Sequence, residues 1–150
     1  MNFQVRGISQ AMADEVRRTR VSPGYGHPAH LEVARGTGPC RCCLRQFVPG
    51  QEQRLLFTFR PEAPGALTAP GPVFIHATHC ESWQGEGFPP GLRGLPLAFE
   101  ARASGSRVTG LSTDVRAPEV QIDSMFADGA EWLHLRNAEA GCFIATIVSA

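Results

Sequence analysis

The sequence predicts an α+β fold: a single domain with a mostly antiparallel sheet and two helices packed on one of its faces. Its 150 residues match the length of one ordinary domain, residues 1–150. Of these residues 43% are hydrophobic and 19% are charged, which is enough apolar surface for a buried core. Strand-like segments also follow one another in runs instead of alternating with helices, an order typical of antiparallel sheets.

The N-terminal part is expected to form a strand and a helix. Residues 3–8 alternate between apolar and polar side chains, as a half-buried strand does. Ser9 can cap a helix that continues to about Arg18, because Met12 and Val16 lie four residues apart on one helical face.

Four strands are expected in the middle of the chain, where apolar residues gather between stretches rich in Pro and Gly. They are residues 31–35, 40–47, 53–60 and 72–78. The turn VPGQ joins the second strand to the third, so these two are predicted to form a hairpin. Residues 81–94 form a long loop, and loops of this length often cover or carry a site.

The last third of the chain is expected to form a second hairpin, a helix and two closing strands. The tripeptide SGS joins strands 95–103 and 107–115. A helix is expected at 117–129, with a proline in its first turn, and strands at 131–136 and 142–148 complete the sheet. The apolar residues expected in the core are Leu56, Phe57, Phe59, Val73, Ile75, Phe99, Phe143 and Ile147.

The composition excludes several classes of function. The net charge is +0, with 14 basic and 14 acidic residues, so the surplus of positive charge that binds nucleic acid is missing. All the basic residues are arginine, which together with frequent Ala, Gly and Pro indicates a GC-rich bacterial genome. We find no membrane-spanning stretch and no signal peptide. The number of cysteines is odd, five, which indicates reduced thiols and not a set of disulfides. The expected location is cytoplasmic, with no membrane or nucleic-acid partner and with a homo-oligomer left open.

Two clusters of thiols and imidazoles could hold a metal. Cys40, Cys42, His79 and Cys80 could make a tetrahedral zinc site, with His76 as a substitute. On a continuous strand His76 and Cys80 would lie roughly 13 Å apart, so they could share one metal only if the chain turns sharply after position 77. No cofactor is expected, and zinc is the alternative.

The same cysteines leave thiol chemistry open, so whether the protein is an enzyme stays undecided. Arg41 and Arg45 flank the first cluster and could favour a thiolate. A disulfide between Cys40 and Cys80 is conceivable across neighbouring strands, and in a reducing cytosol it would be labile. Cys80 is expected near the surface and more reactive than Cys142, which opens an apolar strand.

A third arrangement suggests a pocket for a small anionic molecule. Arginine, histidine and aromatic side chains on one face of a sheet are typical of such pockets. The candidate residues are Arg41, Arg45, His76, Trp132, His134 and Arg136. Binding of an anionic ligand, or a sheet-based interaction, is therefore the function that we favour over a thiol- or metal-dependent enzyme or redox protein using residues 40–43 and 76–80.

Four stretches resemble one bacterial family. They are GPCRCCLRQFVPGQEQRLLFTFRP, GPVFIHATHC, LPLAFEARA and WLHLRNAEAGCFIATI, in that order. Together they resemble domain-of-unknown-function family 1203 over about residues 38–148. The resemblance implies a small, single-domain cytoplasmic bacterial protein, and it carries over no catalytic residue.

Overall fold

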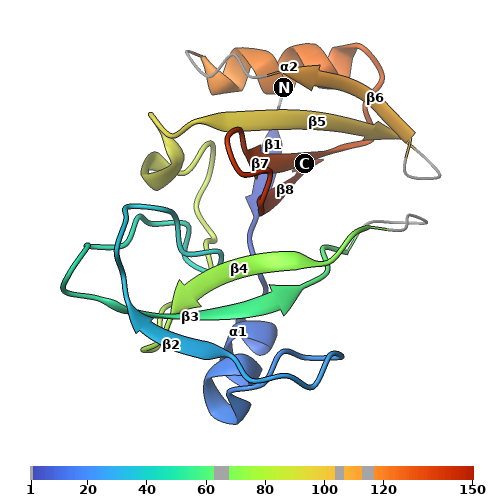
Figure 1. The fold of residues 1–150 in the computed structure, drawn as a ribbon. Helices are drawn as coiled ribbons and strands as arrows, with labels where there is room; N and C mark the ends of the chain where they lie inside the picture. Colours follow the sequence, from blue (N-terminus) through green and yellow to red (C-terminus); the bar gives the residue numbers. More distant parts are fainter. Residues whose placement is uncertain (1, 63–67, 104–106, 113–116) are drawn as a thin grey trace.

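The computed structural model describes residues 2–62, 68–103, 107–112 and 117–150, and of residues 107–112 it describes the backbone alone. The described chain forms two antiparallel sheets, which confirms the predicted α+β class (Figure 1). The expected single sheet is therefore divided into two. Alternation along each strand predicts which face is buried, but it does not predict which strands pair.

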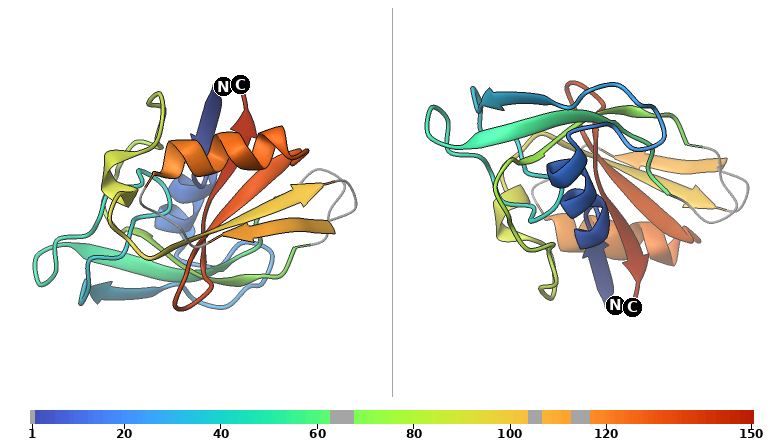
Figure 2. Two further views of the ribbon diagram at one scale, coloured as in Figure 1. Left: turned by 90° about the horizontal axis from the view of Figure 1, so that it is seen from above. Right: turned by 90° about the horizontal axis from the view of Figure 1, so that it is seen from below.

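The larger sheet has five strands in the order β1-β8-β7-β5-β6, and the smaller has three in the order β2-β3-β4. The strands of the larger sheet are β1 (Phe3–Arg6), β5 (Leu97–Ala103), β6 (Arg107–Ser112), β7 (Trp132–Asn137) and β8 (Phe143–Ser149). Those of the smaller sheet are β2 (His30–Val33), β3 (Gln53–Phe59) and β4 (Gly71–His76). Phe3 pairs with Ser149, so the two ends of the chain lie side by side (Figure 2).

Each sheet has its own helix, so the expectation of two helices on one face is wrong. α2 (Pro118–Ala127) packs on the five-stranded sheet through Ile122 and Met125. α1 (Gln10–Thr19) packs on the three-stranded sheet through Ala13 and Val16. Figure 1 shows the two helices on opposite sides of the molecule, with both sheets between them. The reason is that each sheet has an apolar face that needs a cover, and each helix has one apolar side.

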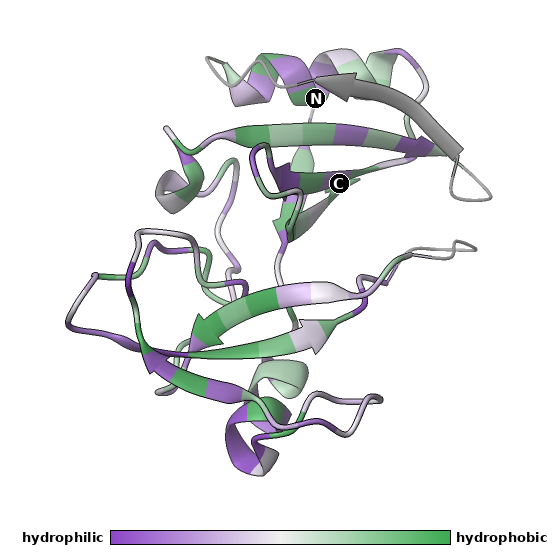
Figure 3. Cartoon of the chain, in the orientation of Figure 1, coloured by the Kyte–Doolittle hydropathy of each residue, from purple (hydrophilic) through white to green (hydrophobic). Residues whose placement is uncertain are grey.

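Ser9 caps α1 as expected, since its side chain accepts a hydrogen bond from the backbone N–H of Met12 at 3.2 Å. A short 3-10 helix, η1 (Pro90–Leu92), interrupts the loop that precedes β5. β3 and β4 are most hydrophobic in their middle residues, 55–57 and 73–75 (Figure 3).

The largest local correction concerns residues 40–47, which form a turn instead of a strand. The Leu44 N–H bonds to Cys40 O at 2.9 Å, and the Cys40 N–H bonds to Arg45 O at 2.8 Å. Leu44 has a φ of 61°, and this left-handed conformation reverses the chain. The expected hairpin with 53–60 is therefore also wrong, and β3 pairs with β2 and β4.

The expected core is largely confirmed. Buried residues are Phe57, Val73, Ile75, Phe99, Phe143 and Ile147. Leu56 and Phe59 are only half-buried, and Leu55 occupies the core position next to Leu56.

Ile75 provides a test of this packing. We expect Ile75→Val to lower the free energy of unfolding by about 0.5–1.5 kcal/mol, because it removes one methylene group from a fully buried site. Urea unfolding measures the change. The control is Val120→Ala on the exposed side of α2, for which we expect a change within about 0.5 kcal/mol. An equal effect of both variants would contradict the packing described here.

Candidate metal centre

Four buried side chains of the metal-binding type meet beyond the end of β4. Their ligand atoms, three sulfurs and one imidazole nitrogen, all lie within 4.8 Å of one another. The four residues are Cys40, Cys43, His76 and Cys80. They come from three segments: the turn at 40–45, the last residue of β4, and the chain that follows β4.

The turn at 40–45 brings two of the thiols together. Cys40 and Cys43 are separated by two residues, and the tight turn places both sulfurs on its inner side. Hydrogen bonds to two neighbouring segments fix the turn: the Arg41 N–H donates to Phe74 O of β4, and Arg41 O accepts from the Ile8 N–H ahead of α1. The first bond holds the turn beside the strand that carries His76.

Helix α1 holds the third segment in place. Arg17 donates from Nε to His76 O at 3.0 Å, and Gln10 donates from Nε2 to Cys80 O at 3.1 Å. The Ser82 N–H returns a hydrogen bond to Gln10 Oε1. The chain therefore turns after β4, which satisfies the condition under which His76 and Cys80 can share a metal.

Two distances within the cluster fit a tetrahedral ion. Zinc bonds of about 2.3 Å to sulfur and about 2.0 Å to nitrogen set two sulfurs about 3.8 Å apart, and sulfur and nitrogen about 3.5 Å apart. Cys40 Sγ lies 3.8 Å from Cys80 Sγ, and Cys43 Sγ lies 3.5 Å from His76 Nδ1. Two of the six edges of a Cys₃His tetrahedron are thus already present, and all four ligand atoms lie within 4.8 Å of one another.

Hydrogen bonds and charges around the cluster favour anionic sulfur. The His76 backbone N–H donates to Cys40 Sγ at 3.2 Å, and Arg17 Nη2 donates to Cys80 Sγ at 2.9 Å. Hydrogen bonds from Cys40 and Cys80 hold the pKa of the Cys43 thiol well below its usual range. Hydrogen bonding to Cys40 and Cys43 raises the pKa of His76 to about 10. Hydrogen bonds to the neighbouring cysteines and burial raise the pKa values of the Cys40 and Cys80 thiols, so the anionic sulfur is that of Cys43.

Glu52 fixes the orientation of the imidazole. Its Oε2 atom lies 3.0 Å from His76 Nε2, at ion-pair distance. The pair is not aligned as a regular hydrogen bond, and Nε2 has no hydrogen-bond partner among the described residues. A carboxylate at this nitrogen leaves Nδ1 to face the sulfurs, as in carboxylate–histidine–zinc arrangements.

The cluster differs in two members from the set that the sequence indicates. Cys43 takes the place expected of Cys42, and His76, the expected substitute, takes the place of His79. Cys42 Sγ instead faces the backbone oxygen of Cys80 at 3.8 Å. His79 is two-thirds exposed and lies 3.7 Å from a carboxylate oxygen of Asp14.

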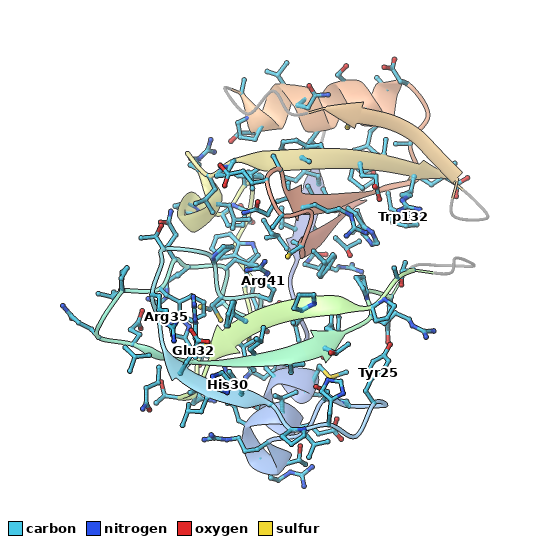
Figure 4. The ribbon with its side chains drawn as sticks, viewed as in Figure 1. Tyr25, His30, Glu32, Arg35, Arg41 and Trp132 are labelled. Carbon is cyan, nitrogen blue, oxygen red and sulfur yellow. The ribbon has the colours of Figure 1, made fainter. Side chains whose placement is uncertain are left out.

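The residues expected to bind an anion do not gather in one pocket. His76 belongs to the metal cluster, and Arg45 is exposed. Arg41 is buried, and it donates hydrogen bonds to Phe143 O and Pro39 O. Burial lowers its pKa to about 10, so it stays charged at neutral pH. Figure 4 shows Arg41 and Trp132 in the layer between the two sheets.

The other three candidates lie on one face of β7. The ring of His134 lies 4.5 Å from that of Trp132 and 5.3 Å from that of Phe143, and it is fully buried. Neither ring nitrogen of His134 has a hydrogen-bond partner among the described residues. Burial lowers its pKa to about 3, reinforced by the charges of Arg136 and Arg102. Arg136 itself lies 3.6 Å from a carboxylate oxygen of Glu100.

The expected order of thiol exposure is wrong. Cys80 is buried under Arg17, whereas Cys142 is partly exposed. All five cysteines carry free thiols. The reason is that Cys142 precedes β8 and lies outside its buried part, while the chain after β4 turns inward.

Brief alkylation of the native protein should therefore modify Cys142 first, because thiol reactivity follows exposure. Mass-spectrometric mapping of the labelled peptides measures the order. Alkylation of Cys80 before Cys142 would contradict the burial of the cluster.

Comparison with known proteins gives one match. The family described as Protein of unknown function (DUF1203) matches residues 37–148, in agreement with the resemblance of the four stretches. No curated protein and no solved structure matches the chain. Within the described residues, neither helix has the length and hydropathy needed to cross a membrane.

Proposed function

The chain belongs to the DUF1203 family of proteins of unknown function, and we propose that it is a zinc-binding protein with one structural ion. Three thiolates and one imidazole would bind the ion: Cys40, Cys43, Cys80 and His76. The observation that carries the proposal is the pair of distances 3.8 and 3.5 Å, which fit the edges of a zinc tetrahedron.

The donor set supports zinc over other common ions. Thiolate and imidazole ligands suit zinc, whereas magnesium and calcium prefer oxygen. The segment C-R-C-C also contains the spacing of two residues, between Cys40 and Cys43, that is common in zinc sites.

A structural role is supported by the closure of the site. Four protein ligands fill a tetrahedral shell, whereas catalytic zinc keeps one position for water or substrate. All four side chains are buried, with Cys40 fully so. The ion would join the turn at 40–45, the end of β4 and the chain that follows it, which pack together in the smaller of the two core clusters.

Metal analysis and cobalt substitution test the proposal. We expect one equivalent of zinc per chain after purification under reducing conditions. Cobalt(II) exchanged into the site should give the strong visible bands of tetrahedral coordination and the near-ultraviolet charge-transfer band of thiolate ligands. Octahedral cobalt bands, or failure to take up either metal, would overturn the proposal.

A matched pair of variants tests which cysteines bind. Cys43→Ser should lower zinc affinity at least about tenfold, because it removes a ligand. Cys42→Ser, one residue away and also buried, should retain one equivalent of zinc. Competition with a chromogenic chelator measures both affinities. The reverse ranking would favour the set with Cys42 and His79.

A second candidate function is binding of a small anionic molecule between the sheets. A cavity of about 710 Å³ there is lined by Arg6, Arg60 and Thr146, among others. Thr146 pairs with His134, whose buried ring nitrogens would gain from a polar ligand. A thermal-shift screen with organic phosphates and carboxylates tests this function. Stabilisation that disappears in Arg60→Gln is expected, and an unchanged melting temperature for all compounds would contradict it.

A further inference from the structure

The cluster also has the geometry of a thiol–disulfide switch. We propose that hydrogen peroxide joins Cys40 to Cys80 as a disulfide and so releases the metal. This inference rests on the proposed zinc function and adds its regulation.

The two sulfurs are close and lie on different segments. A disulfide requires an S–S distance of about 2.05 Å, and these sulfurs are 3.8 Å apart. The chain after β4 that carries Cys80 has no regular secondary structure, and side chains of α1 hold it. A shift of this segment can therefore close the gap without breaking the ladder between β3 and β4.

Cys80 is the more exposed of the two sulfurs that would join. Its side chain is 8% exposed, whereas Cys40 is completely buried behind it. Arg17 Nη2 donates a charge-assisted hydrogen bond to Cys80 Sγ at 2.9 Å, so this sulfur lies at the cationic edge of the cluster. The thiolate is the form of cysteine that attacks peroxide.

The reaction proceeds in two balanced steps. The Cys80 thiolate attacks one peroxide oxygen, the O–O bond breaks, and hydroxide leaves and takes up a proton to become water. The Cys40 thiolate then attacks the sulfur of the Cys80 sulfenic acid, forms the S–S bond and expels a second hydroxide, which also becomes water. Two thiolates, one peroxide and two protons thus give one disulfide and two waters. Two electrons pass from the sulfurs to the peroxide oxygens.

Loss of two ligands would leave only Cys43 and His76 for the ion, which is too few for tight binding. Oxidation would also remove the anionic sulfur that Arg17 contacts, so α1 would lose one of its bonds to the chain after β4. Thiol reductants attack the disulfide and restore both ligands, so the switch is reversible.

The test follows zinc and sulfur in the same sample. Zinc-loaded protein, with its metal content measured beforehand, is treated with increasing hydrogen peroxide in the presence of a chromogenic zinc chelator. We expect one zinc released per disulfide formed, and a peptide map without reduction should link Cys40 to Cys80. Dithiothreitol should then restore zinc uptake. A link between Cys40 and Cys43, a link between Cys42 and Cys80, or sulfinic acid without a disulfide would overturn the assignment.

Arg17 provides a second readout. Zinc-loaded Arg17→Met, compared with the wild type at the same measured zinc content, should release zinc to peroxide about three- to tenfold more slowly, because the cationic hydrogen-bond donor beside Cys80 is gone. The matched control is Arg18→Met, an exposed arginine on the same helix, which should release zinc at the wild-type rate. Equal rates in all three proteins would contradict the role given to Arg17.

The metal measurement separates the two proposals. Protein that binds zinc and keeps it in excess peroxide overturns the switch and leaves the structural zinc site intact. Protein that binds no zinc overturns both. In Cys142→Ser, which lacks the most exposed thiol, release by peroxide should be unchanged, and a loss of release there would contradict a switch within the cluster.

Discussion

Removal of zinc is expected to lower the free energy of unfolding by about 4 kcal/mol, for a free zinc concentration a thousandfold above the Kd. Since the complete site exists only in the folded chain, the free energy of zinc binding adds to the stability of the fold. For a chain of this size the loss corresponds to a fall in Tm of about 8–16 °C. Thermal and urea unfolding with and without a strong chelator measure it.

The loss should be concentrated in the smaller half of the molecule. All four ligands belong to the three-stranded sheet and its surroundings, and none lies on the five-stranded sheet or α2. Hydrogen exchange after chelation should therefore quicken at residues 40–46 and 76–82 and in α1, while β5 and β7 stay protected. Cys43→Ser, which lacks a ligand and binds zinc more weakly, should lose less stability to the chelator than the wild type does. Equal destabilisation of both proteins by chelator would show that the effect does not come from this site.

The sequence predicts the strands of this protein better than it predicts the turn at 40–45, which carries two of the four cluster residues. Alternation and Pro/Gly punctuation indicate β3, β4, β5, β7 and β8 close to their actual bounds. The same reasoning suggests a strand at 40–47, where Arg41, Arg45 and Phe47 would share one face. A leucine with positive φ is rare, so nothing in the amino-acid sequence indicates that the chain reverses at Leu44.

The candidate site could be predicted in part. The spacing of Cys40 and Cys43 by two residues is a zinc-knuckle signal that is present in the sequence, and reading the segment as a strand places the two sulfurs on opposite faces. The role of His76 depends on the turn after β4, which a single sequence does not reveal. Arg17 and Glu52 lie far from the ligands along the chain, so only the fold brings them to Cys80 and His76.

The other large expected effect, on the free energy of unfolding, is that of a substitution at Gly7, which lies beside the turn at 40–45. We expect Gly7→Ala to lower the free energy of unfolding by about 1–3 kcal/mol, as overpacking of a tight contact does. A Cβ at this position would lie 2.4 Å from Arg41 O and 3.2 Å from Cys42 O, both in the backbone of the turn. The φ of Gly7 is not positive, so the cost comes from the contact alone.

The turn cannot simply retreat from the added methyl group. Arg41 O accepts the Ile8 N–H at 2.7 Å, and the Arg41 N–H donates to Phe74 O of β4 at 2.9 Å. On a second side Gly91 packs equally closely, since a Cβ there would lie 2.4 Å from Leu44 O. Displacement of the turn therefore breaks one of these bonds or drives it toward Gly91.

Because the same turn carries Cys40 and Cys43, Gly7→Ala should weaken zinc binding as well as the fold. Urea unfolding and chelator competition, carried out on the same preparation, measure the two effects. The matched control is Gly36→Ala: Gly36 is exposed, and in the described part of the chain only its own neighbours come within 4 Å of the added Cβ. Gly7→Ala could instead lower the stability of the fold and leave the zinc affinity unchanged. That result would mean that the turn shifts without moving the sulfurs of Cys40 and Cys43, and it would contradict our view that Gly7 and its neighbours hold these sulfurs in place.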